Sequence, residues 1–276
     1  MRMENRKRII SHCQHKFSEV NHELSIFMST IRAWFETHPK LTKGSPPVIH
    51  SVKSRLKDPD HLEEKINRKL GVSFDEDPTA EKVFEGLTDL AGVRVLLLHQ
   101  QQFSDLHTEF QKKIQEDWYL VEPPKAYTWD PESAKFFRSL DIVTHIKESQ
   151  YTSLHYVIRP KEGSKLVCEV QVRTLFEEIW GEVDHTLNYP SPTASVACSE
   201  QLSVLAKVVG AGSRLVDSIF KSSKTIHGEE SVVVSESAEV SVEHLAVSAP
   251  VTPVPAVDTP VVAPDENGPE INPEVR

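Results

Sequence analysis

Cysteine is scarce in this chain, and long apolar runs are absent. The 276 residues include three cysteines, Cys13, Cys168 and Cys198, and these form no CxxC pair. Neither a zinc ribbon nor a disulfide framework is therefore predicted. No apolar run approaches the roughly 18 residues that a membrane span needs, and none follows the basic N-terminus. We expect a soluble, cytoplasmic protein that does not enter a membrane.

Basic residues are nearly absent from residues 225–276, where ten acidic residues are accompanied by Arg276 alone. The other 30 basic and 31 acidic residues leave residues 1–224 close to neutral. A near-neutral body lacks the broad basic surface that binding to a nucleic-acid backbone usually requires. Residues 225–276 also contain seven prolines and show no sustained periodicity, so this acidic tail is predicted to be disordered.

Helical periodicity dominates the start of the chain. Apolar residues recur at helical spacing over residues 4–37, which predicts one long amphipathic helix whose apolar stripe belongs to the core or to a dimer surface. The prolines between residues 117 and 137 favour irregular structure there. The helix predicted from 174 to 187 should turn Leu175, Ile179, Val183 and Leu187 inward. The remaining predicted elements are strands over 50–55 and 91–98 and helices over 60–70, 103–115 and 202–224.

Two neighbouring strands carry most of the chemistry. Residues 150–158 and 166–174 read as β-strands joined by a turn at 160–163. Because side chains alternate across a strand, each has an apolar face and a polar face. An ordinary antiparallel pair with one wet face is the plain interpretation of either strand alone. If the polar faces lie together, however, one patch gathers Tyr151, His155, Glu169, Gln171 and Arg173.

Basic and acidic side chains also stand at the edges of two other predicted strands. Arg55, Lys57 and Lys65 surround a strand-to-helix turn, and a helix N-terminus with nearby cations is a ready phosphate site. A solvated basic face is the alternative. Asp89 directly precedes the buried strand, where it can cap a turn. Together with Glu169, it can equally serve as one of the one or two carboxylates that Mg²⁺ usually takes from a protein.

The order and spacing of these motifs resemble a known family. The runs DLAGVRV at 89–95, YTSLHY at 151–156 and EVQVRT at 169–174, followed by Trp180 and His185, are similar to the core of the RelA/SpoT-type alarmone synthetases. These enzymes transfer pyrophosphate from ATP to the ribose 3′-hydroxyl of GDP or GTP. The resemblance implies an α/β fold of nucleotidyltransferase type, in which helices flank a mixed sheet of about five strands.

The resemblance also divides the chain into four parts. Residues 1–44 would form the N-terminal helix, and residues 45–190 the synthetase domain. A C-terminal helix over residues 191–224 would precede the disordered tail of residues 225–276.

Individual residues receive roles from the same resemblance. Asp89 and Glu169 would be the catalytic and Mg²⁺-binding carboxylates, while Arg55 and Arg94 would stack on the two faces of adenine, a role that suits a planar guanidinium. The ATP site is implied to contain Arg55, Lys57, Lys65 and Arg94. The acceptor site is implied to contain Arg138, Lys147, Tyr151, His155, Gln171 and Arg173.

Several positions depart from the family pattern. Asp58 and His61 stand where the family commonly has serines, Ser149 and Gln150 replace an Asn-Gly, and the family usually crosses 117–137 in fewer residues. Three functions therefore stay open: a GTP diphosphokinase-type enzyme, a toxic relative that modifies tRNA or another nucleotide, and a nucleotide-sensing protein without turnover. The chain has no His-Asp dipeptide of the kind found in the family's hydrolase domain, so alarmone hydrolysis is not expected. A homo-oligomer is compatible with the sequence.

Overall fold

The computed structural model describes residues 3–70, 74, 78–189 and 192–236. The chain divides into two units, residues 1–229 and residues 230–276, and the sheet belongs to the first. The strands are β1 (Ile49–Leu56), β2 (Ala91–Leu97), β3 (Tyr119–Leu120), β4 (Lys125–Thr128), β5 (Val143–Ile146), β6 (Ser153–Arg159) and β7 (Cys168–Thr174). The helices are α1 (Met3–Thr37), α2 (Pro39–Thr42), α3 (Pro59–Lys69), α4 (Ala80–Glu85), α5 (Gln102–Asp117), α6 (Pro131–Ser139), α7 (Leu175–Asn188) and α8 (Val196–Glu236).

The seven strands found among the described residues form one mixed sheet. Their order is β1-β2-β7-β6-β4-β5, and β3 pairs with β6 outside this path. The pairs β2–β7 and β4–β5 are parallel, whereas β1–β2, β6–β7 and β4–β6 are antiparallel. The predicted α/β class is confirmed, with more strands than the five or so expected.

The expectation of irregular structure between residues 117 and 137 is wrong. This segment contains β3, β4 and most of α6. Its prolines mark the ends of these elements: Pro123 and Pro124 precede β4, and Pro131 occupies the first turn of α6. Proline is tolerated in a first helical turn because the N–H that it lacks would have no partner within the helix.

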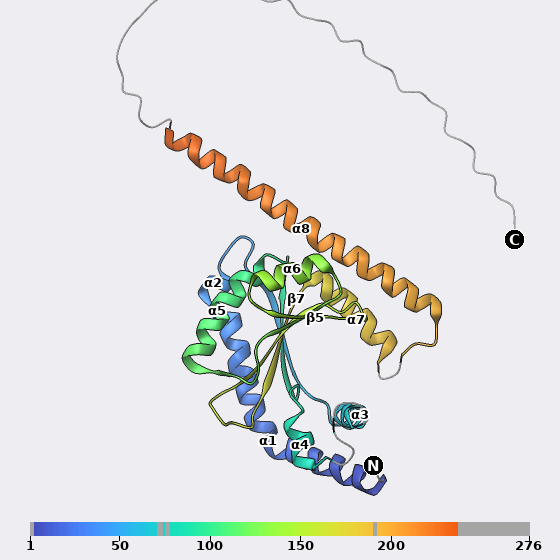
Figure 1. The fold of residues 1–276 in the computed structure, drawn as a ribbon. Helices are drawn as coiled ribbons and strands as arrows, with labels where there is room; N and C mark the ends of the chain where they lie inside the picture. The colour runs from blue at the N-terminus through green and yellow to red at the C-terminus, as the bar shows by residue number, and fades with distance from the viewer. Residues whose placement is uncertain (1–2, 71–73, 75–77, 190–191, 237–276) are drawn as a thin grey trace, which may run out of the picture. The chain divides into compact units, whose positions relative to one another are not determined.

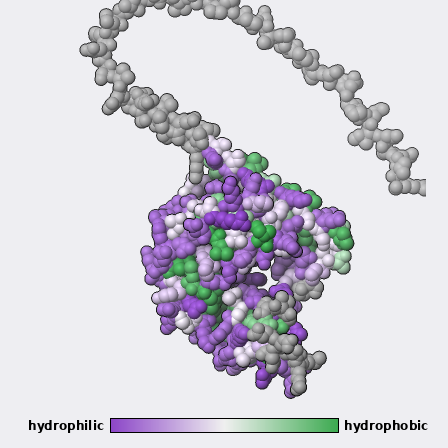
Figure 2. Space-filling view, in the orientation of Figure 1, coloured by the Kyte–Doolittle hydropathy of each residue, from purple (hydrophilic) through white to green (hydrophobic). Residues whose placement is uncertain are grey.

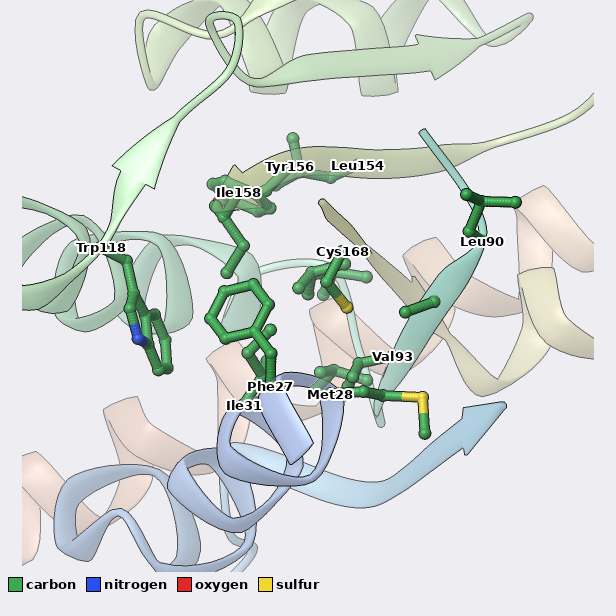
Figure 3. Close-up of a cluster of buried hydrophobic side chains, with 14 of the residues drawn as sticks. Phe27, Met28, Ile31, Leu90, Val93, Trp118, Leu154, Tyr156, Ile158 and Cys168 are labelled. Carbon is green, nitrogen blue, oxygen red and sulfur yellow. The ribbon is translucent and has the colours of Figure 1, made fainter. Parts of the chain in front are cut away.

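One face of the sheet is the hydrophobic core. The register places Leu154 opposite Val172 and Tyr156 opposite Val170, and all four side chains are buried. Helices α1 and α5 lie along this face (Figure 1). Figure 3 shows the resulting cluster, in which the labelled residues Phe27, Met28 and Ile31 of α1 lie close to residues of the central strands.

The long first helix is confirmed as a core element. Ile9, Cys13, Phe17, Leu24 and Ile31 are each at most 4% exposed, as the helical spacing of the apolar residues requires. The stripe ends in an aromatic cluster with α5 and the residue that follows it, because Trp34 lies 5.5 Å from Phe110 and 6.1 Å from Trp118 between ring centroids. The aromatic stripe therefore belongs to the core.

Helix α7 begins as predicted but turns a different side inward. Thr174 caps it in a reciprocal pair with Glu177, the arrangement known as a capping box. However, Ile179 is 54% exposed and Val183 38% exposed, while Glu178 and Trp180 are buried. The apolar period alone therefore gave the wrong inward face. The polar face of the sheet attracts Glu178, and Trp180 packs against α8, where its indole N–H donates to the carbonyl of Leu202 at 3.2 Å.

Helix α8 extends beyond the predicted end near Lys224 and reaches Glu236. Its helical pattern contains no proline over these residues, so nothing in the backbone chemistry requires it to stop earlier. The part of the acidic tail from 237 to 276, which was predicted to be disordered, lies outside the described residues.

Within the described part of the chain, no helix is both long and apolar enough to cross a membrane. The face shown in Figure 2 is mainly hydrophilic, with small and separate hydrophobic patches.

Candidate active site

The polar face of the sheet, opposite the core, carries two rows of functional side chains that cross the central strands. Arg55 lies opposite Gly92, which in turn lies opposite Glu169. In the second row, two residues away along each strand, Lys53 lies opposite Arg94, Arg94 opposite Gln171, and Gln171 opposite His155. Because side chains alternate, all of these residues project from the same face. The predicted meeting of the polar faces of β6 and β7 is confirmed.

A continuous chain of hydrogen bonds joins the polar residues of β6 and β7. Arg173 donates to the Tyr151 hydroxyl at 2.6 Å, the Tyr151 hydroxyl lies 2.9 Å from Nε2 of His155, and Nδ1 of His155 lies 3.0 Å from Glu169. Gln171 donates to the second Glu169 oxygen at 2.7 Å and accepts from Arg173 at 3.0 Å. With Nδ1 of His155 as the donor to Glu169, both oxygens of the Glu169 carboxylate accept a hydrogen bond, one from His155 and one from Gln171.

Glu169 is held as a carboxylate. Burial alone would raise its pKa, but the hydrogen bonds and charge of His155, the hydrogen bond from Gln171 and the charge of Lys65 lower the pKa to about 2. A group with so low a pKa is a weak proton acceptor at neutral pH. The Glu169 carboxylate is instead well suited to bind a cation or to stabilise a positive charge nearby.

Asp89 lies between two of the predicted phosphate-binding lysines. Lys57 is 3.6 Å from its Oδ2, and Lys65 forms an ion pair with its Oδ1. Burial, together with the charges of Lys65 and Arg55, lowers the pKa of Lys57, although Asp89 opposes this shift. Lys65 acts electrostatically on Glu169 as well, so it links the two carboxylates.

The N-terminus of α3 does not form the free anion site that the sequence suggested. Asp58 caps this helix, and its carboxylate accepts from the backbone N–H of Asp60 at 2.9 Å and of His61 at 3.3 Å. A carboxylate already occupies the donors that a phosphate would use. Of the groups predicted to bind phosphate at this turn, the lysines Lys57 and Lys65 remain as candidates.

Arg94 is fixed against α7 by two acidic residues. Its Nη1 donates to Glu178 at 2.9 Å and to Glu182 at 2.7 Å. Burial works against the charge on Arg94, but the two carboxylates raise its pKa above the ordinary value. Glu178 also contacts Lys53 at 3.0 Å and Arg173 at 3.4 Å, so this buried carboxylate ties three cations of the sheet to the helix. Arg55 is exposed on the same face.

Arg173 lies beneath α7, where only a glycine leaves room for it. The residue is 5% exposed, and a Cβ atom on Gly181 would come within 2.7 Å of its Nη1. The Arg173 guanidinium also lies 4.8 Å from the ring centroid of Tyr151, which is the geometry of a cation–π contact. Its Nε is buried without a hydrogen-bond partner.

These groups surround one cavity of about 480 Å³, a volume typical of small-molecule sites. Strands β1, β2 and β7 provide its floor, and α7 contributes Gly181, Glu182, Asp184 and His185 to its lining. Seven predicted site residues line the cavity: Arg55, Asp89, Arg94, Tyr151, Glu169, Gln171 and Arg173. His155, Lys57 and Lys65 join it through their contacts with Glu169 and Asp89.

The comparison with protein-family models shows which family this chain belongs to. A family model described as a region found in RelA / SpoT proteins matches residues 54–194, just over half of the chain. The chain belongs to the RelA/SpoT family. The matched range contains all of the predicted site residues, although their roles remain predictions.

Solved structures agree with this membership at the level of the fold. Small alarmone synthetase 1 from Bacillus subtilis is 16% identical, with a TM-score of 0.56, and the match covers 76% of this chain and 99% of the other. A GTP pyrophosphokinase family protein from Streptococcus pneumoniae is 18% identical, with a TM-score of 0.53, and the match covers 82% of this chain and 97% of the other. A search of curated proteins finds no match.

Two residues assigned to the acceptor site by resemblance lie elsewhere. Arg138 is exposed on α6, Lys147 is exposed just after β5, and neither lines the cavity of about 480 Å³. The family resemblance assigned them to the site of Tyr151, but β4 and β5 lie on the far side of β6 from Glu169. Whether they bind an acceptor stays a prediction.

One departure from the RelA/SpoT pattern has an unusual backbone conformation. Gln150, which stands where the family usually has glycine, has a φ of 61°. This is the left-handed region, which glycine adopts without strain and other residues adopt rarely. The loop before Tyr151 therefore keeps the conformation that favours glycine, at some cost in strain.

Three contributors to the RelA/SpoT site were missed by sequence reasoning. Lys53 could have been found, because it stands two residues before Arg55 in a strand and so shares its face. Glu178 lies outside the apolar stripe that the sequence predicted for α7, and no local pattern pointed to its partners on the sheet. Tyr127 gave no usable signal, because it lies in the segment read as irregular, yet its ring centroid is 4.9 Å from that of His155.

Proposed function

We propose that this RelA/SpoT chain transfers pyrophosphate from ATP to the ribose 3′-hydroxyl of GDP or GTP. The observation that carries the proposal is the arrangement about Glu169. Cationic side chains lie on one side of this carboxylate, on β1, β2 and α3, and a tyrosine–histidine pair lies on the other side, on and before β6. Two reactants can therefore meet over a single carboxylate. The similar fold of a GTP pyrophosphokinase family protein from Streptococcus pneumoniae supports this choice.

The donor half is suited to a triphosphate and a planar base. Lys57 and Lys65 supply charge beside Asp89, while Arg55 and Arg94 come from adjacent strands and line the same cavity. Planar guanidinium groups stack well on aromatic bases. We therefore assign the ATP phosphates to the lysines and adenine to the arginines.

The acceptor half would hold the nucleotide that is modified. Tyr151 offers an aromatic ring, and stacking on aromatic side chains is worth about 1–3 kcal/mol per base. In the reaction, the 3′-oxygen forms a bond to the β-phosphorus of ATP, the bond from that phosphorus to the oxygen of the α-phosphate breaks, and AMP leaves. The hydroxyl proton passes to Glu169 or to solvent. The low pKa of Glu169 favours an electrostatic role for it over proton transfer.

Mg²⁺ is the cofactor that we propose, and the available donors fit it. Asp89 and Glu169 line the same cavity, and hard oxygen ligands of this number, completed by substrate phosphates, suit Mg²⁺. The described residues hold no cluster of three or more His, Cys, Asp or Glu side chains that would suit a different metal centre. Bound Mg²⁺ would neutralise charge that develops on the transferred group. Because Lys65 already pairs with Asp89, it would share this carboxylate with the ion.

The test follows the transferred phosphorus atoms. ATP labelled in its β- and γ-phosphates is offered with Mg²⁺ to the full chain, together with GDP, GTP and deacylated tRNA in competition, at two salt concentrations. We expect label on the guanosine nucleotides and unlabelled AMP. Glu169→Gln is the matched control, which should fold and lose at least ~100-fold in rate, the scale seen when a key electrostatic group is removed.

Other outcomes would support one of the two alternative functions. Label mainly on tRNA, with a steep loss at higher salt, would favour a tRNA-modifying enzyme. Nucleotide binding without AMP release would favour a sensing protein. Product formation by Glu169→Gln at the wild-type rate would contradict the assignment of this carboxylate.

A further inference from the structure

A second group of polar and aromatic side chains lies on the polar face beyond β6. The ring of Tyr127 on β4 is stacked on that of His145 on β5, with centroids 5.5 Å apart and planes at 27°. It meets His155 edge-on at 4.9 Å and 79°. The ammonium group of Lys147 lies 4.8 Å from the Tyr127 ring centroid. We call Tyr127, His145 and Lys147 the β4–β5 cluster.

Strand register places the β4–β5 cluster next to the acceptor half of the site. Tyr127 lies opposite Ser153 on one side and opposite His145 on the other. Its neighbours along β4, Ala126 and Thr128, are fully buried on the core side, so Tyr127 projects from the same face as His155. The donor groups lie on β1 and β2, at the opposite end of the strand order from β4 and β5. A molecule that is bound over His155 and extends away from the donor groups would therefore reach this cluster.

The charge on Lys147 distinguishes the cluster from an ordinary aromatic contact. Lys57 and Lys65 are both paired with Asp89. Lys147, in contrast, has no carboxylate partner among the residues that the structure describes, and its ammonium contacts the face of Tyr127. A cation–π contact of this kind restrains a flexible side chain. It also leaves the charge available to an anion.

We propose that Tyr127, which is stacked on His145, is a positioning residue that holds Lys147 to bind the 5′-phosphates of the acceptor nucleotide. The inference rests on the proposed function, because it concerns the acceptor of that reaction. The inference also assigns a role to Lys147, which lies outside the cavity of about 480 Å³. The phosphate chain of a nucleotide whose ribose lies near Glu169 would cross His155 and end at the β4–β5 cluster.

Steady-state kinetics on the full chain test this role. Tyr127→Leu removes the π face, and we expect the KM for GDP to rise roughly fivefold, in line with a cation–π contact of about 1 kcal/mol, while kcat and the KM for ATP stay within about twofold. Tyr127→Phe keeps the ring and should keep the KM for GDP. A merely structural defect would change the two KM values and the melting temperature together.

A double-mutant cycle then asks whether Tyr127 acts through Lys147. Lys147→Ala should raise the KM for GDP, and adding Tyr127→Leu should raise it no further, because the two side chains form one unit. Tyr119→Leu is the matched control: Tyr119 is a 46% exposed tyrosine on β3 of the same sheet, and this change should leave both KM values unaltered. Additive effects of Tyr127→Leu and Lys147→Ala would overturn the positioning role.

Calorimetric titration with GDP separates this inference from the proposed function. If the wild-type chain binds GDP without forming labelled product, the proposed reaction fails, and weaker GDP binding by Tyr127→Leu still supports the inference. An unchanged affinity for GDP in folded Tyr127→Leu would overturn the inference even if the reaction proceeds. A wild-type chain that binds no GDP would overturn both.

Discussion

Asp58 shows how one side chain can change the electrostatics of the proposed donor site. Its carboxylate caps α3 and places a negative charge beside Lys57, at a position where the RelA/SpoT family commonly has serine. Serine is an equally good N-cap without the charge. Either aspartate or serine can therefore cap α3 in this fold. The two residues differ in how strongly they allow an anion to bind nearby.

We predict that Asp58→Ser lowers the KM for ATP by roughly three- to tenfold, because it removes a repulsion of about 1 kcal/mol at the solvent-exposed end of the site. Asp58→Asn is the control that keeps the size and the cap while removing the charge, and it should behave alike. Both variants should melt close to the wild-type temperature. A KM for ATP that stays constant or rises in both would show that the triphosphate does not lie near α3.

Glu178 joins α7 to the sheet through ion pairs with three basic residues. It is 6% exposed and meets Lys53, Arg94 and Arg173. Burial by itself would raise its pKa, but these cations lower the pKa below its ordinary value. The carboxylate therefore stabilises the folded protein above the ordinary pKa, and this contribution is lost as pH falls through the depressed folded-state pKa.

Glu178→Gln should accordingly reduce the free energy of unfolding at pH 7 by about 3–5 kcal/mol, the range for breaking a buried ion pair. The difference from wild type should shrink as the pH falls below about 4.5, the range in which the wild-type carboxylate gains a proton. Urea titrations at a series of pH values measure both quantities. A difference that stays constant down to about pH 3 would mean that the charge of Glu178 contributes little.

At the scale of elements, the close packing of α7 on Arg173 of the sheet requires one small residue. Gly181 lies where the helix passes over Arg173, and any Cβ there would overlap its Nη1. Glycine within a helix ordinarily costs about 1 kcal/mol relative to alanine. Its presence is explained by the close approach of the guanidinium, whose hydrogen bonds hold Tyr151 and Gln171.

We predict that Gly181→Ala displaces Arg173 and lowers the rate of turnover at least tenfold, while the melting temperature changes little because the gain in helix propensity offsets the clash. Gly210→Ala in α8 is the matched control: its Cβ would meet Arg214 at 3.6 Å, an ordinary contact. This variant should be slightly more stable and fully active. Equal activity of the two variants would rule out a functional need for the close packing at Gly181.

At the scale of the whole molecule, α8 and the acidic tail differ in what they contribute. Along its first half, α8 buries Leu202, Ala206 and Val209 against Trp180. It is also tied to the loop after β2, because Asp217 accepts from the backbone N–H of Gln101 at 3.0 Å and lies 2.8 Å from Nδ1 of His99. The composition of residues 237–276, rich in proline and acidic residues, predicts that they contribute little to the fold.

A chain that ends at residue 236 should therefore unfold cooperatively at the wild-type temperature and keep its activity. A chain that ends at residue 193 should lose several kcal/mol of stability, because it exposes Trp180 and its neighbours. Thermal unfolding and turnover of both truncated proteins check the prediction. A large loss of stability or activity in the chain ending at 236 would show that the tail contributes to the fold.

The sequence by itself determined those features that depend on local chain geometry. The alternation of apolar and polar residues in 153–159 and 168–174 predicted which side chains of β6 and β7 share a face. The helical period predicted α1, and the cap residue Thr174 predicted the start of α7. Each signal lies within a short stretch of the chain, so no knowledge of the sheet order was needed.

The tertiary structure alone decided how these elements meet. Strand order placed β4 beside β6 and β5 beyond β4, which brought Tyr127 to His155 and left Lys147 outside the cavity. The charged face of β1 and β2 turned Glu178 inward and left Ile179 exposed, against the apolar period of α7. Such choices depend on pairings between distant residues and on the balance of burial and charge at each contact, which no local pattern contains.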